Sequence, residues 1–350
     1  MEIIFKKVRL RGSLTDITVR DGVIASILPT DKSGQDMDGM MVYPGLFDIH
    51  SHGCVGQDTM MGDGLDAMSE YLYSRGITAW LPTTTSAPLP LIQKVTARIP
   101  AKKQGRAEVL GYHIEGPFIS KAYKGAMAEQ YLSDPDPLAL ASVRNAAMVT
   151  LAPELPGALD MIRSCKATVS LGHTACDYDT AEKAFEQGAR CVTHLFNAMP
   201  PFLHREPSLV GAALTKGAYV QVIADGLHLH PSVVLAAYRM FGPDRMILIS
   251  DSICATGLCD GTYSFFGYDI HVKNGQARTP DGALCGSTTD LAECVRRAIS
   301  FGIPADDAFK MASETPYKLL RIKRGVIKPG YPADMIFLND RWEVCKVFRP

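Results

Sequence analysis

The pattern of apolar and polar positions divides the chain into two β-rich ends and a long middle segment. Residues 1–43 alternate short apolar runs with turn residues, as in "EIIFKKVRL" and "DITVRDGVIASI". Residues 325–350 repeat this pattern in "GVIKPGYPADMIFLNDRWEVCKVF". Such alternation is typical of hairpins rather than helices. We therefore expect the two ends to pair into one small sheet domain, beside a main domain of residues 44–324.

In the middle segment, short apolar runs alternate with amphipathic stretches such as "GLDAMSEYLYSRG", "ALDMIRSC", "YDTAEKAFEQGA" and "PSVVLAAYRMFG". Strands that alternate with helices indicate a parallel sheet, and eight such strands predict an α/β fold of the (β/α)8 TIM-barrel type. The eight expected strands are residues 46–50, 78–84, 109–115, 148–154, 168–173, 191–197, 219–225 and 245–251.

Polar residues able to bind a metal or move a proton stand at the ends of these runs. Seven of the eight strands finish in or beside such a residue, namely His50, Glu115, Glu154, His173, His194, Asp225 and Asp251. Active sites of barrels are assembled at the C-terminal ends of the strands. The sequence therefore places its candidate chemistry at the mouth of the barrel.

Composition narrows the partners of the protein to small molecules. The 350 residues carry a formal net charge of -1, so the chain lacks the excess of positive charge that binding to nucleic acid or an anionic membrane requires. No apolar run approaches the length of a membrane span, and the first residues lack the features of a signal peptide. The nine cysteines form no CxxC pair and suit buried thiols in a reducing compartment, so we expect a cytoplasmic protein.

The stretch "YPGLFDIHSHG" places His50 and His52 two residues apart, at the end of the first expected strand. In an extended strand this spacing directs both imidazoles to the same side. The pair could hold one metal ion or fill a core, and the spacing alone leaves both interpretations open.

Three further residues fit the requirements of a catalytic metal. Glu115, His173 and His194 come from three different strands, and catalytic zinc commonly takes about three protein ligands plus water. A divalent ion lowers the pKa of bound water toward about 7. Asp251, in "LISDSICATG", is placed to accept the proton of that water. The set predicts metal-assisted hydrolysis.

Several motifs in order resemble those of the N-acetylglucosamine-6-phosphate deacetylase family of the amidohydrolase superfamily. They are "PGLFDIHSHG", "GYHIEGPFIS", "SLGHT", "THLFNAMPP", "HREPSLVGAAL", "IADGLHLHP", "LISDSICATG" and "GALCGSTTDL". The resemblance implies hydrolysis of the acetamide of N-acetylglucosamine 6-phosphate, giving glucosamine 6-phosphate and acetate. It also implies that the β-rich ends form the small β-sandwich domain of that family.

The resemblance further implies roles for single residues. Glu115, His173 and His194 would bind the principal divalent metal, with zinc or iron expected, and Asp251 would act as general base and then acid. The residues expected at the sugar phosphate or the acetyl group are Ala126, Met127, Asn197, Ala198, Arg205, His228, Leu284 and Cys285. In some members of the family the equivalent arginine reaches the neighbouring subunit's site, so a homodimer is expected.

The sequence departs from the best-known pattern at Met127, in "YKGAMAEQ", where the family commonly has a histidine that polarises the substrate carbonyl. Methionine donates no hydrogen bond. Three alternatives follow: the metal polarises the carbonyl alone, another group such as His113 substitutes, or the acyl group or sugar is different.

The H-x-H pair also separates members of the family. Members that carry it can bind a second ion bridged by the glutamate of the third strand, so His50 and His52 make either one or two ions possible here. In the alternative interpretation the pair is hydrogen-bonded and the second position stays empty.

Two other functions compete with this prediction. Many cyclic-amide hydrolases bridge two metals with a carboxylated lysine at the end of the fourth strand, but here that run reads "MVTLAPE" without lysine. A catalytically silent sugar-phosphate sensor would not need the complete ligand set and base.

Overall fold

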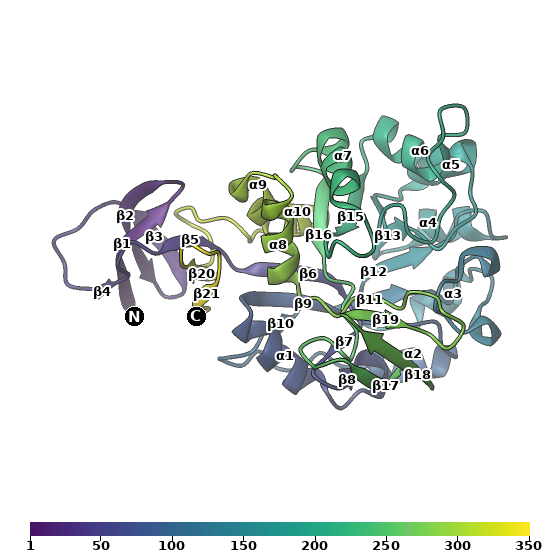
Figure 1. Cartoon of the computed structure of the whole chain (residues 1–350), viewed down its shortest axis with the longest axis horizontal. Coiled ribbons are helices and arrows are strands. Elements are labelled where there is room, and N and C mark those ends of the chain that lie inside the picture. The colour runs from purple at the N-terminus through teal and green to yellow at the C-terminus, as the bar shows by residue number, and fades with distance from the viewer. Residues whose placement is uncertain (266) are drawn as a thin grey trace.

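Both ends of the chain build a small sheet domain at one side of the molecule (Figure 1). The computed structural model describes residues 1–265 and 267–350. The strands of this domain are hydrogen-bonded in the order β21-β20-β5-β1-β2-β3, and β4 pairs with β1. They are β1 (Glu2–Leu10), β2 (Ser13–Arg20), β3 (Val23–Ile27), β4 (Gln35–Asp36), β5 (Met41–Pro44), β20 (Met335–Leu338) and β21 (Val344–Phe348).

The predicted pairing of the two ends is confirmed. Strand β5 from the N-terminal end pairs antiparallel with β20 from the C-terminal end, with Val42 opposite Phe337. Side chains from both ends, among them Phe5, Ile17 and Met335, form a core that belongs to this domain. Burial of this core therefore holds the first and last strands together.

The main domain is a nearly closed barrel of eight parallel strands (Figure 1). Each overlaps one of the runs expected from the sequence. The strands are β6 (Leu46–Ser51), β9 (Ile77–Thr84), β11 (Tyr112–Glu115), β12 (Ala146–Leu151), β13 (Thr168–Leu171), β14 (Cys191–Val192), β15 (Tyr219–Ile223) and β16 (Met246–Ile249). A further short strand, β10 (Glu108–Val109), pairs with β9. The Asp251 amide donates to the His50 carbonyl over 2.9 Å, which joins the last strand region to the first.

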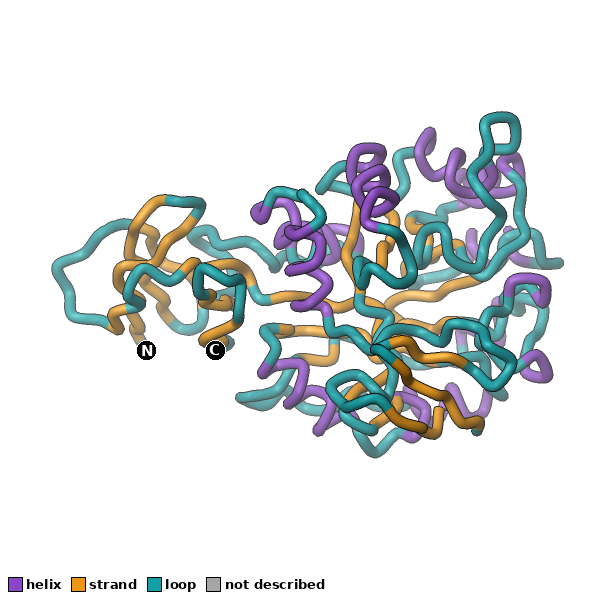
Figure 2. The backbone as a smooth tube through the Cα atoms, in the orientation of Figure 1, coloured by secondary structure: helices purple, strands orange, loops and turns teal. Residues whose placement is uncertain are grey.

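Helices surround the barrel (Figure 2), and the four amphipathic stretches predicted from the sequence are all helical. The helices are α1 (Leu65–Ser74), α2 (Leu89–Thr96), α3 (Pro137–Ala141), α4 (Ala158–Ser164), α5 (Tyr178–Gln187), α6 (Ser208–Lys216), α7 (Pro231–Phe241), α8 (Leu291–Ser300), α9 (Ala305–Met311) and α10 (Glu314–Leu319). Three single-turn 3-10 helices lie in loops: η1 (Thr59–Met61), η2 (Lys121–Tyr123) and η3 (Glu129–Tyr131). None of the described helices has the length and apolar character that a bilayer-spanning helix requires.

Apolar side chains fill the interior of the barrel below the C-terminal ends of its strands. Phe47 and Ile49 of β6 point into this interior cluster, together with residues from the other strands. Tyr317 of α10 stacks on Phe47 with ring centroids 4.4 Å apart, so α10 contributes to the same core. The interior is therefore packed, and the C-terminal ends of the strands remain for chemistry.

After β16 the chain forms a three-stranded antiparallel sheet that the hydrophobic pattern alone does not predict. Its strands are β17 (Gly261–Phe265), β18 (Tyr268–Lys273) and β19 (Gln276–Arg278). Ile253 of the preceding loop and Ile270 of β18 share a small core with Cys285. A second two-stranded hairpin, β7 (Gly53–Cys54) and β8 (Gln57–Asp58), directly follows β6.

Candidate metal-dependent active site

The candidate ligands meet at the C-terminal ends of different strands. His50 lies within β6 and Glu115 is the last residue of β11, whereas His173, His194 and Asp251 each follow their strands by two residues. These last three residues adopt positive φ angles of 48°, 28° and 50°. An L-residue in this region pays a steric cost, and such strain is concentrated at functional sites.

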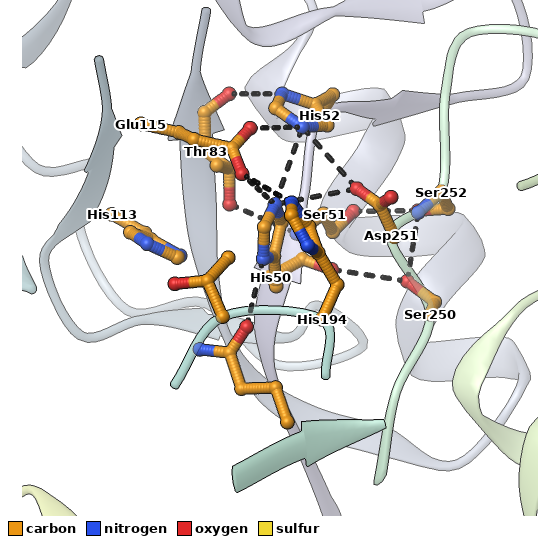
Figure 3. Close-up of polar contacts among 12 residues, drawn as sticks. His50, Ser51, His52, Thr83, His113, Glu115, His194, Ser250, Asp251 and Ser252 are labelled. Carbon is orange, nitrogen blue, oxygen red and sulfur yellow. Dashed lines mark hydrogen bonds and ion pairs between the residues drawn. The ribbon is translucent and has the colours of Figure 1, made fainter. Parts of the chain in front are cut away.

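Glu115 lies between two groups of histidines, and Figure 3 shows His50, His52 and His194 around its carboxylate. In the first group, Nε2 of His173 and Nε2 of His194 lie 3.4 and 3.2 Å from Glu115 Oε1. In the second group, His50 Nε2 lies 3.3 Å from Oε1 and His52 Nε2 lies 3.2 Å from Oε2. Oε1 of this buried carboxylate thus faces three imidazole nitrogens, and Oε2 faces one.

Asp251 completes the second group (Figure 3). Its Oδ1 atom lies 3.3 Å from Nε2 of both His50 and His52. Burial alone would raise the pKa of Asp251, but the positive charge of His50 and the hydrogen bond with His52 lower it to about 2. Asp251 is therefore a carboxylate at neutral pH and can accept a proton.

Each of the four histidines has its other ring nitrogen, Nδ1, next to an oxygen. This arrangement fixes the proton on Nδ1 and leaves the lone pair on Nε2 whenever the ring is neutral. The acceptors are Gln221 Oε1 for His50 at 2.9 Å, the Thr83 carbonyl for His52 at 3.2 Å, the Tyr123 carbonyl for His173 at 2.9 Å and the Asn197 carbonyl for His194 at 3.2 Å.

The donor set fits a divalent cation. Nε2 of His194 and Nε2 of His173 are 3.0 Å apart, so two lone pairs face each other when both rings are neutral. Glu115 Oε1 is buried and has no hydrogen-bond partner among the described residues. Burial opposes the charged form of His52, yet hydrogen bonds with Asp251 and Glu115 raise its pKa to about 10. The site thus favours positive charge at its centre, which protons or a metal ion can supply.

A cavity of about 360 Å³ opens above this cluster. Most residues of the ligand cluster line it. Seven of the eight residues expected to contact substrate line it as well, namely Ala126, Met127, Asn197, Ala198, His228, Leu284 and Cys285. Its volume is in the range of small-molecule sites. The structure therefore brings the expected ligands, base and most of the expected substrate contacts to one place.

Arg205 is the exception, because it lies in an exposed loop and not among the residues that line this cavity. Arg205 also forms no ion pair with its exposed neighbour Glu206 among the described residues. Within the described part of a single chain, Arg205 therefore contacts neither the cavity nor an acidic partner.

The structure rules out one of the three alternatives raised by Met127, the substitution of His113 for the missing histidine. His113 is buried and both of its ring nitrogens are engaged, Nδ1 with the Ile49 carbonyl at 3.0 Å and Nε2 with Thr150 Oγ1 at 2.7 Å. It does not line the cavity. His113 thus supports the barrel beneath His50 and is not a substitute donor. Met127 does line the cavity, and its sulfur accepts the Ser86 amide over 3.4 Å.

Glu154 and Asp225, two of the polar residues expected at strand ends, do not join the ligand cluster but hydrogen-bond to groups beside it. Glu154 accepts hydrogen bonds from the Ala175 amide at 2.6 Å and the Thr174 hydroxyl at 2.5 Å, which braces the loop after His173. Asp225 Oδ2 lies 2.6 Å from Nδ1 of His228. Burial opposes the charged form of His228, but Asp225 raises its pKa. His228 can therefore present a protonated ring to the cavity.

Several residues at the site lie outside the set expected from the sequence. Phe265 and Tyr268 reach the cavity from the unpredicted sheet β17–β19, and the Tyr268 hydroxyl donates to the Ala126 carbonyl over 2.7 Å. Gln221 is a polar residue in the middle of a buried strand. That position is unusual for glutamine and was the one available sign of its role.

A family model described as "Amidohydrolase family" matches residues 41–348, which include the whole barrel and every candidate ligand. The chain belongs to the amidohydrolase family. The small domain and the barrel of this amidohydrolase together match solved relatives over almost their whole length. It is 30% identical to N-acetylglucosamine-6-phosphate deacetylase from Thermotoga maritima, with a TM-score of 0.91 over 99% of this chain and 98% of that one.

Curated relatives confirm the resemblance to the deacetylases. The amidohydrolase is 36% identical to N-acetylglucosamine-6-phosphate deacetylase of Vibrio furnissii, over 87% of its own chain and 80% of the relative. It is 35% identical to N-acetylgalactosamine-6-phosphate deacetylase of Escherichia coli O157:H7, over 95% of its own chain and 92% of the relative. A Mycobacterium smegmatis deacetylase mutant, solved with N-acetyl-D-glucosamine-6-phosphate, is 28% identical with a TM-score of 0.90, over 100% of this chain and 97% of that one.

Proposed function

We propose that this amidohydrolase hydrolyses the acetamide of N-acetylglucosamine 6-phosphate to glucosamine 6-phosphate and acetate. The observation that carries the proposal is the bridging position of Glu115 between two histidine groups, with the Asp251 carboxylate beside them at the floor of the cavity. Related proteins with this activity match nearly the whole chain.

Glu115, His173 and His194 would hold the principal ion, and His50 with His52 would hold a second one. When bound, the ion supplies a Lewis acid that acidifies water and polarises the amide carbonyl. Asp251, ionised at neutral pH, takes the proton of the attacking water and returns it to the amine that leaves. Tyr123 and Asn197 keep His173 and His194 oriented through their main-chain carbonyls.

The cavity wall supports a sugar-phosphate substrate. Its described lining residues include no lysine or arginine, and His228, paired with Asp225, is the lining residue outside the ligand cluster that can carry a positive charge. We therefore assign His228 to the phosphate or a hydroxyl. Arg205 would add a planar guanidinium that binds phosphate bidentately. Since it lies outside the cavity of its own chain, we propose that it serves the partner subunit of a homodimer.

The donor types support zinc or iron as the metal, because imidazole and carboxylate suit both. The nine cysteines are free, which supports a reducing compartment and hence a cytoplasmic location. The absence of lysine from β12 (Ala146–Leu151) argues against the lysine-bridged cyclic-amide hydrolases.

Acetate release by metal-loaded protein tests the function. We expect rapid release from N-acetylglucosamine 6-phosphate, little release from unphosphorylated N-acetylglucosamine, and loss of activity with a chelator that excess metal restores. N-Acetylgalactosamine 6-phosphate belongs in the same assay, because one relative at 35% identity bears that name. Equal rates on phosphorylated and unphosphorylated sugar would refute the phosphate role, and a faster rate on the galactosamine compound would reassign the substrate.

A further inference from the structure

His50 differs from the other three histidines of the site in what holds its ring. His52, His173 and His194 direct Nδ1 at main-chain carbonyls, which no substitution of the accepting residue's side chain can remove. His50 directs Nδ1 at a side chain, Oε1 of Gln221, over 2.9 Å. Its orientation therefore depends on one replaceable residue.

Gln221 stands in the middle of β15 and is completely buried. Its amide nitrogen lies 3.6 Å from Met148 Sδ, a weak acceptor. The arrangement leaves the amide oxygen for His50. An oxygen at this place requires a proton on Nδ1, so the Nε2 lone pair of a neutral His50 ring points to Glu115 and Asp251.

The neighbouring His113 ring cannot take over this role. The His113 ring packs edge-on against His50 with centroids 4.5 Å apart, but both nitrogens of His113 are occupied by Ile49 and Thr150. Without the Gln221 oxygen, the buried Nδ1–H of His50 would lose its acceptor. A neutral ring would then be free to place its proton on Nε2, where the proton would displace a cation from the His50 and His52 group.

We propose that Gln221 is a positioning residue that sets the occupancy of the second metal position, formed by His50, His52 and the Glu115 bridge. This inference rests on the proposed metal-dependent function. It assigns no role to Gln221 in the first position, because His173 and His194 have acceptors of their own.

The test is a metal titration without substrate. Chelator-treated protein is dialysed against Zn²⁺ at neutral pH, and bound zinc per subunit is measured by mass spectrometry of the metal. We expect two ions for the parent protein. Gln221→Leu should bind the first ion as before and the second about 10- to 100-fold more weakly. Gln221→Glu, which keeps an oxygen at the same reach, should retain both.

A parent protein that binds a single ion at saturating zinc would overturn the proposal, as would Gln221→Leu with an unchanged second binding constant. Equal weakening of both ions would also refute it, since that result indicates general damage to the barrel. If Gln221→Leu fails to fold, Gln221→Asn withdraws the oxygen by one methylene and gives the same test. Metal count needs no turnover, so its outcome is separate from that of the acetate assay.

Discussion

At the scale of single residues, the site concentrates backbone strain on three of its candidate ligand and base residues. His173, His194 and Asp251 all adopt left-handed φ angles immediately after their strands. Conformations of this kind cost of order 1–3 kcal/mol each and persist only where the surroundings impose them. Two main-chain hydrogen bonds hold Asp251 in this conformation. Its amide donates to the His50 carbonyl, and its carbonyl accepts from the Ser287 amide. The strain turns these side chains from the barrel wall toward one centre.

At the cavity, one glycine is required because the backbone passes close to a candidate ligand. Gly125, with a φ of 57°, belongs to the segment that carries Met127, and a Cβ at its position would lie 3.3 Å from His173 Cε1. Any side chain there would press on a candidate ligand in a backbone conformation that L-residues avoid. Because it has glycine at this point, the segment can pass close to the candidate ligand His173.

At the scale of elements, the sheet β17–β19 connects the wall of the cavity to His173, a candidate metal ligand. Tyr268 of β18 holds the Ala126 carbonyl, and three residues earlier the Tyr123 carbonyl holds His173. The sheet thus restrains the loop that links the cavity wall to the candidate ligand cluster.

Removal of the Tyr268 hydroxyl should loosen this restraint. We expect Tyr268→Phe to lower kcat/KM for acetate release about fivefold, because a hydrogen bond contributes about 1 kcal/mol net. Tyr263→Phe is the matched control, since that hydroxyl lies on the same sheet, donates to the Cys259 carbonyl and does not line the cavity. A Tyr268→Phe enzyme with the kinetics of the parent would contradict the proposed restraint.

The elements that could be predicted from the sequence are those with a strong period. The barrel strands are apolar runs buried on both faces, and helices such as α5 show a regular amphipathic pattern, so both were predictable. Strands β17–β19 are short and partly exposed, so the hydrophobic pattern does not predict them, although Asn274-Gly275 marks the β18–β19 turn.

In the candidate site, too, the sequence predicts some of the residues and not others. Glu115, His173, His194 and Asp251 could be predicted because parallel strands bring their C-terminal ends to one edge. The acceptors that orient the histidines could not, because three are main-chain carbonyls that any residue provides. The place of Arg205 outside its own cavity also required the structure, since a loop's direction depends on tertiary packing.

At the scale of the whole molecule, the position of Arg205 predicts complementation between subunits. Arg205→Ala should lower activity on the phosphorylated substrate by raising KM, with no loss of stability, because the residue is exposed. Asp251→Asn should be inactive. When the two variants are mixed under conditions that exchange subunits, hybrid dimers contain one site with both intact residues.

Random pairing in a symmetric dimer should then restore about one quarter of the parent activity. The control is each variant mixed with itself, which should gain nothing. A mixture no more active than the sum of its parts, or a protein that is monomeric in solution, would show that Arg205 does not act across subunits.

The most direct test of the whole account is the turnover number of Asp251→Asn, measured in a sample whose metal content is determined at the same time. Asparagine keeps the shape of the side chain but cannot accept the proton of water. We expect the ion at Glu115, His173 and His194 to be retained and kcat for acetate release to fall about 10²- to 10⁴-fold. A metal-loaded Asp251→Asn protein that releases acetate as fast as the parent would contradict the account.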